Sequence, residues 1–147
     1  MQYPITHTCG HTITHQLYGK GSERESRAAW LERQPCLQCK RDAELNAALN
    51  ANQEAGLPAL TGSEKQIAWA EQIRAKVITE FTGRFDRALA RATDPAVAEQ
   101  IAARRTAVFG WFAEQTDSRY WIDSRFETAD ERIAVVAKAL MARGVSL

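Results

Sequence analysis

Apolar and polar residues alternate along the first part of this chain. Between residues 3 and 18, Ile13, His15 and Leu17 share one parity, and the residues between them are polar. Such alternation, with frequent threonine, isoleucine and tyrosine, is typical of β-strands. The pattern predicts a short β-hairpin, which is ended by the two glycines that follow residue 18.

Further along the chain, apolar residues recur at steps of three and four, which is the spacing of amphipathic helices. Four local signals mark where such helices begin. Ser22, Ser63 and Thr128 each stand three residues before a Glu or Gln, an arrangement called a capping box, and Asp94 directly precedes a proline. We expect helices to start at these positions, and another helix, rich in alanine and glutamate, over residues 40–54.

The helices after residue 60 carry apolar stripes that can build a core. The stripes comprise Ile67, Ala70, Ile73, Val77, Phe81, Phe85 and Leu89, then Val97, Ile101, Val108 and Phe112, then Ile133, Val136, Ala137 and Leu140. Residues 118–126 fit either a helix end or an ordered turn. The spacing predicts a mainly α (α+β) fold, in which a helical bundle over residues 60–147 follows the hairpin. Such apolar stripes would also serve a homodimer.

Composition restricts the classes of function. The chain has 147 residues, with 19 Lys or Arg and 18 Asp or Glu, for a formal net charge of +1. This balance differs from that of proteins that depend on the phosphate backbone of nucleic acids. The sequence has no run of about 18 apolar residues and no signal-peptide pattern. We therefore expect a cytoplasmic protein with no membrane partner.

All three cysteines lie in two short clusters, which are Cys-Gly-His at residues 9–11 and Cys-Leu-Gln-Cys at residues 36–39. Three thiolates and one imidazole are the ligand set of a closed tetrahedral zinc site. Reduced thiols in the cytoplasm favour a metal over a disulfide. The predicted ligands of Zn²⁺ are Cys9, His11, Cys36 and Cys39.

A site with four protein ligands has no open coordination position, so we interpret it as structural. His7 or His15 could replace His11, which we favour because it completes the turn around Gly10. A redox Cys-x-x-Cys motif is the other interpretation, and the lack of a βαβ pattern disfavours it. We predict that residues 1–55 form a zinc-ribbon-like module whose folding depends on the metal.

No catalytic signature accompanies this site in the sequence. We recognise no nucleophile–base pair and no glycine-rich phosphate loop. An enzyme would require an open position on the metal, for example if His11 were not a ligand. We therefore expect that the protein is not an enzyme.

Several motifs occur together along the chain. They are Cys-Gly-His at 9–11, Gln-Leu-Tyr-Gly-Lys at 16–20, Arg-Glu-Ser-Arg at 24–27, Trp-Leu at 30–31, Cys-Leu-Gln-Cys at 36–39, Leu-Thr-Gly-Ser-Glu-Lys-Gln-Ile-Ala-Trp-Ala-Glu-Gln-Ile-Arg at 60–74 and Trp-Ile-Asp-Ser-Arg at 121–125. This combination resembles a group of bacterial zinc-ribbon-type proteins that occur largely on phages, plasmids and other mobile elements. Tyr120 departs from the pattern, which has a tryptophan there. The resemblance implies a zinc-binding accessory protein of a mobile element.

One candidate surface for a protein partner lies within residues 119–125. Tryptophan, tyrosine and arginine dominate binding hot spots. The candidate contacts are Arg119, Tyr120, Trp121 and Arg125. The alternative is that Trp121 belongs to the core and that Asp123 pairs with an arginine.

A second candidate surface, for nucleic acid, consists of arginines on two successive helices. Its members are Arg84, Arg87, Arg91, Arg104 and Arg105. We favour the alternative of a solvated face paired with Glu80, Asp86 and Asp94, because the net charge is close to zero.

These observations favour a zinc-stabilised binding protein without catalysis. Its expected role is that of an accessory or host-interaction factor of a phage or other mobile element, acting through protein contacts. An inhibitor of a host defence system, such as an anti-CRISPR protein, fits this class. The alternative is a zinc-containing nucleic-acid-binding protein.

Overall fold

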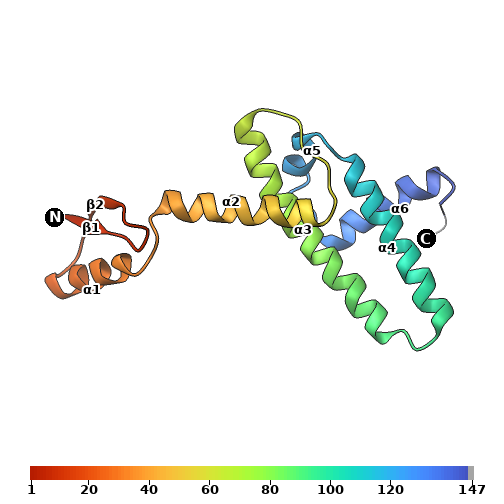
Figure 1. Cartoon of the computed structure of the whole chain (residues 1–147), viewed down its shortest axis with the longest axis horizontal. Coiled ribbons are helices and arrows are strands. Elements are labelled where there is room, and N and C mark those ends of the chain that lie inside the picture. The colour runs from red at the N-terminus through yellow and green to blue at the C-terminus, as the bar shows by residue number, and fades with distance from the viewer. Residues whose placement is uncertain (146–147) are drawn as a thin grey trace. The chain divides into compact units, whose positions relative to one another are not determined.

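The computed structural model describes residues 1–145 and divides the chain into two compact units (Figure 1). The first unit is Met1–Asn46, and the second begins at Ala47. The boundary between the units falls inside helix α2 (Leu37–Glu54). The sequence predicted units of residues 1–55 and 60–147, so the boundary in the structure lies nearer the N-terminus than the predicted one. As predicted, a small β-hairpin precedes a set of helices.

The first unit contains the predicted hairpin. Strands β1 (Gln2–Thr6) and β2 (Thr12–Gln16) pair in antiparallel register, with Ile5 opposite Ile13. Ile5 is buried, whereas Ile13 is exposed. The turn between the strands holds the first Cys-Gly-His cluster, and Gly10 adopts the left-handed φ of 83° that such a turn requires.

Helix α1 (Gly21–Glu32) begins earlier than its sequence predicts. Its N-cap is Lys20, so the prediction of a helix start at Ser22 is wrong. The backbone N–H of Lys20 donates to Oε2 of Glu23 at 3.0 Å. Glu23, and not Glu25, thus closes the first turn, because its carboxylate satisfies a backbone donor that the helix leaves unpaired.

The second unit contains α3 (Glu64–Arg91), α4 (Pro95–Glu114), α5 (Ser118–Asp123) and α6 (Ala129–Ala142). The predicted N-caps Ser63, Asp94 and Thr128 are confirmed, and each side chain accepts a hydrogen bond from a backbone N–H of the first turn. The ambiguous segment 118–126 forms α5 and a turn. Figure 1 shows α4 returning beside α3.

Aromatic rings dominate the core of the second unit. Phe112 packs edge-on against Phe81, with ring centroids 5.1 Å apart, and also contacts Trp111 and Trp121. Trp121 is fully buried, and its indole Nε1–H donates to the carbonyl of Gln115 at 2.9 Å. This bond satisfies the polar atom of an otherwise apolar side chain and fixes α5 against the end of α4.

Within the described residues, no helix is long and apolar enough to cross a membrane.

Candidate metal centre

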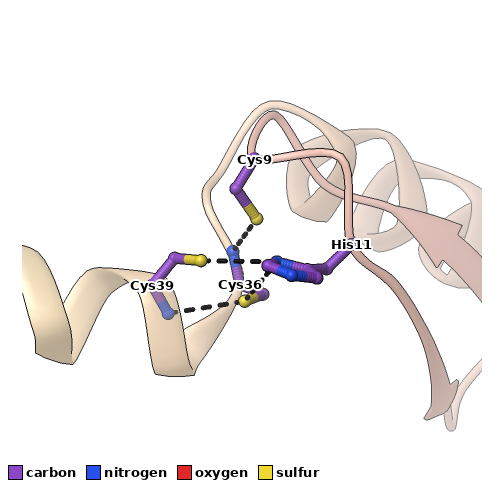
Figure 2. A group of neighbouring side chains, drawn as sticks. All are labelled: Cys9, His11, Cys36 and Cys39. Atoms are coloured by element: carbon purple, nitrogen blue, oxygen red, sulfur yellow. Dashed lines mark hydrogen bonds between the residues drawn. The ribbon is translucent and has the colours of Figure 1, made fainter.

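The hairpin turn and the start of α2 bring four metal-binding side chains together (Figure 2). Cys9 and His11 come from the turn, and Cys36 and Cys39 come from the residue before α2 and from its first turn. The backbone N–H of Thr8 donates to the carbonyl of Gln34 at 3.1 Å and ties the two segments together. One donor atom from each side chain lies within 4.8 Å of the other three.

Two donor–donor distances within the group are close to those of tetrahedral coordination. Nδ1 of His11 lies 3.3 Å from Sγ of Cys39 and 3.7 Å from Sγ of Cys36. Bonds of about 2.3 Å to sulfur and 2.0 Å to nitrogen, at a tetrahedral angle, separate those two atoms by about 3.5 Å. The two observed distances lie on either side of this value, as expected if His11, Cys36 and Cys39 share one ion.

Backbone N–H groups also point at the sulfur atoms. The N–H of Cys36 donates to Sγ of Cys9 at 3.2 Å, and the N–H of Cys39 donates to Sγ of Cys36 at 3.5 Å. Such bonds stabilise thiolate ligands and orient them toward a metal. Cys36 is buried, Cys9 and Cys39 are half-buried, and His11 is exposed.

These contacts separate the pKa values of two cysteines. The hydrogen bond from the Cys36 N–H is the main reason why the pKa of Cys9 falls to about 6. Hydrogen bonding with the Cys36 side chain, followed by desolvation, raises the pKa of Cys39 to about 12. At neutral pH and without a metal, Cys9 is therefore a thiolate, whereas Cys39 retains its proton.

We expect metal binding at pH 7 to release at least one proton per ion, because Cys39 must lose its proton to become a ligand. Protons compete with the metal for that sulfur, so affinity should fall as the pH is lowered. Calorimetric titration in buffers of different ionisation enthalpy measures the release. Equal binding enthalpies in all buffers would contradict this assignment of protonation states.

The other two histidines pair with each other. Nε2 of His7 lies 3.0 Å from Nε2 of His15, and Nδ1 of His7 lies 3.1 Å from the carbonyl of Gln34. The donor group of the described chain contains His11 and neither His7 nor His15. The structure thus favours His11 among the three candidate ligands.

The predicted arginine surface is only partly free of acidic partners. Arg84 pairs with Asp130 at 2.7 Å, and Arg105 pairs with Asp86 at 2.8 Å. Within residues 1–145, Arg87, Arg91 and Arg104 are exposed and form no ion pair.

The predicted partner-binding residues lie in different environments. Trp121 has no exposed surface, so its inclusion among the partner contacts is wrong, and it belongs to the core. Tyr120 is half-buried between Trp111 and Trp121. Arg119 is exposed and pairs with Asp117 at 3.0 Å. Of these four residues, Arg125 alone is exposed and forms no ion pair within residues 1–145.

Trp69, whose ring lies under Arg125, belongs to the motif at residues 60–74 but was not among the predicted partner contacts. A signal for it was present, because Trp69 falls outside the stripe of Ile67, Ala70 and Ile73 and must therefore point away from the core. Phe126 was missed as well, since an isolated aromatic residue after a short helix has no period that places it.

Comparison with known proteins adds no family: no protein-family model, curated protein or solved structure matches the chain. The resemblance to zinc-ribbon-type proteins of mobile elements stays a prediction from the motifs.

Proposed function

We propose that the protein is a zinc-stabilised binding protein that has no catalytic activity of its own. The observation that carries this proposal is the Cys₃His donor group. Thiolate and imidazole donors in a tetrahedral arrangement suit Zn²⁺ better than Mg²⁺ or Ca²⁺, which prefer oxygen ligands. With four protein ligands the ion has no open position for a substrate, and its role is structural.

The small core of the first unit supports a structural role. The buried apolar side chains of this unit are Ile5, Leu17 and Cys36. So few buried side chains contribute little hydrophobic stabilisation, and a metal compensates in small domains of this kind. Zinc would thus hold the hairpin turn to the start of α2.

The partner in this proposal is a protein of the host cell or of a mobile element. The near-neutral charge of the chain and the aromatic side chains exposed on both units support protein contacts. The motifs that resemble mobile-element proteins support the biological setting, including inhibition of a host defence system.

The test is purification of the tagged, zinc-loaded chain from a bacterial host after brief crosslinking, with metal content measured on the same sample. We expect one zinc ion per chain and one host or mobile-element protein at constant stoichiometry. A metal-free sample and a chain that captures no defined partner would both contradict the proposal.

A nucleic-acid-binding role is the second candidate, and it is favoured by Arg87, Arg91 and Arg104, which form no ion pair within residues 1–145. If it is correct, fluorescence anisotropy with short DNA and RNA will give salt-dependent binding. For double-stranded DNA, the slope of the logarithm of the binding constant against the logarithm of the salt concentration should become shallower by about 0.9 for each phosphate contact removed. A double Arg87→Glu, Arg91→Glu variant that binds as tightly as the wild type would exclude this surface.

A further inference from the structure

An exposed arginine of the second unit lies against two exposed aromatic rings. The guanidinium carbon of Arg125 is 5.3 Å from the centroid of the Trp69 ring and 4.3 Å from that of the Phe126 ring. Trp69 belongs to α3, whereas Arg125 and Phe126 follow α5. Residues distant in the sequence therefore form one surface, which we call the Trp69–Arg125–Phe126 surface.

Both rings expose much of their area. Trp69 is 49% exposed and Phe126 is 82% exposed. Covering such apolar area stabilises a complex and offsets part of the cost of association. Neighbouring exposed aromatic rings are typical of sites that contact other molecules.

Arg125 also has unused hydrogen-bonding capacity. Its Nη1 donates to the carbonyl of Ile122 at 2.6 Å, and this is the one hydrogen bond of the Arg125 side chain among the described residues. The other exposed arginine of the segment, Arg119, is already held by Asp117. The remaining N–H donors of Arg125 lie in the plane of the guanidinium, where they match the two oxygens of a carboxylate.

We propose that the Trp69–Arg125–Phe126 surface binds a segment of a protein partner in which a single Asp or Glu lies next to an apolar side chain. The carboxylate would pair with Arg125, and the apolar neighbour would cover the Trp69 ring. The rings hold the guanidinium plane and shield the ion pair from water, which strengthens it. This inference rests on the proposed protein-binding function and adds the surface and the chemistry of the partner.

A protein segment fits this surface better than a nucleic acid does. The exposed Asp123 stands two positions before Arg125 and forms no ion pair within residues 1–145, whereas Glu127, two positions after it, pairs with Arg132 at 3.7 Å. Asp123 repels a strand that carries a phosphate at every nucleotide, whereas a single carboxylate requires only one arginine.

The test begins with random dodecapeptides displayed on phage and selected against the full, zinc-loaded chain. Affinities of the enriched peptides are then measured by fluorescence anisotropy for wild type, Arg125→Gln and Trp69→Ala. Two matched controls replace residues outside the surface: Arg119→Gln removes an exposed arginine, and Trp30→Ala removes a tryptophan that is 48% exposed. Circular dichroism on all variants verifies that they fold.

We expect the enriched peptides to share an acidic residue beside an apolar one. Arg125→Gln and Trp69→Ala should each weaken their binding about tenfold or more, while both controls stay within about twofold. Arg125→Lys should also weaken binding, because lysine keeps the charge but loses the planar fork.

Other results would overturn the proposal in distinguishable ways. If enriched peptides bind Arg125→Gln and Trp69→Ala as tightly as the wild type, the surface is wrong but the protein-binding function stands. If no peptide is enriched, and host-cell purification yields no partner, both fail. If the wild type is a homodimer that dissociates in the Trp69→Ala variant, the surface binds a second copy of the chain. If a single-stranded oligonucleotide displaces the peptides only from chains with Arg125, the surface binds nucleic acid.

Discussion

Replacing Cys36 with serine is expected to abolish stoichiometric metal binding and to unfold the first unit while the second stays folded. Cys36 is 2% exposed, and its sulfur lies within 3.7 Å of Nδ1 of His11. A serine hydroxyl is a poor zinc ligand, and structural zinc contributes about 10–16 kcal/mol of apparent binding energy in small metal-dependent domains. Metal analysis gives the stoichiometry, and hydrogen exchange should report loss of protection only in residues 1–46.

The matched control is His15→Gln, which changes a nearby histidine that lies outside the donor group. This variant should still bind one ion per chain. A Cys36→Ser protein that retains both the ion and the protection of the first unit would show that the four side chains do not hold the metal together. Treatment of the wild type with a chelator should reproduce the exchange pattern of the variant.

Replacing Arg74 with methionine is expected to lower the stability of the second unit by about 3–5 kcal/mol, because it leaves a buried charge without its partner. Arg74 and Glu71 are 2% and 3% exposed. Nη2 of Arg74 donates to both carboxylate oxygens of Glu71, at 2.9 and 2.8 Å, and Nη1 donates to the carbonyl of Pro58. Urea denaturation followed by circular dichroism measures the loss.

A double-mutant cycle separates the charge effect from the loss of packing. Glu71→Leu combined with Arg74→Met should recover most of the lost stability, since no uncompensated charge remains. The control is Arg105→Met, which removes the partly exposed partner of Asp86 and should have little effect on stability. If Arg74→Met and Arg105→Met lower the free energy of unfolding by the same small amount, burial does not make the Glu71–Arg74 pair more stabilising than an exposed pair.

Local signals in the sequence predicted part of the fold. Ser63, Asp94 and Thr128 cap helices because each accepts from a backbone N–H within three residues, so no distant contact is needed. Lys20 could not be predicted in the same way, since a lysine side chain cannot accept such a bond, and the cap depends on Glu23 instead. The donor group followed from ligand type and spacing, which metal geometry restricts closely.

The burial of charged side chains and the contacts between residues distant in the sequence could not be predicted from the sequence. Glu71 and Arg74 stand three positions apart, which is also the spacing of ordinary surface pairs, and nothing local indicates that both are buried. Arg84 meets Asp130 across 46 positions, so its pairing depends on how α6 packs on α3. The contact of Trp69 with Arg125 depends on tertiary packing in the same way.

All four ligands precede the second unit along the chain. The last of them, Cys39, is synthesised before Ala47, where that unit begins. Because domains generally fold in the order in which the ribosome makes them, the donor group can assemble before the second unit is translated. The core of the second unit must wait for α6, since Val136 and Leu140 belong to it. An ion at the donor group would therefore act on the first unit before Val136 and Leu140, which belong to the core of the second, are synthesised.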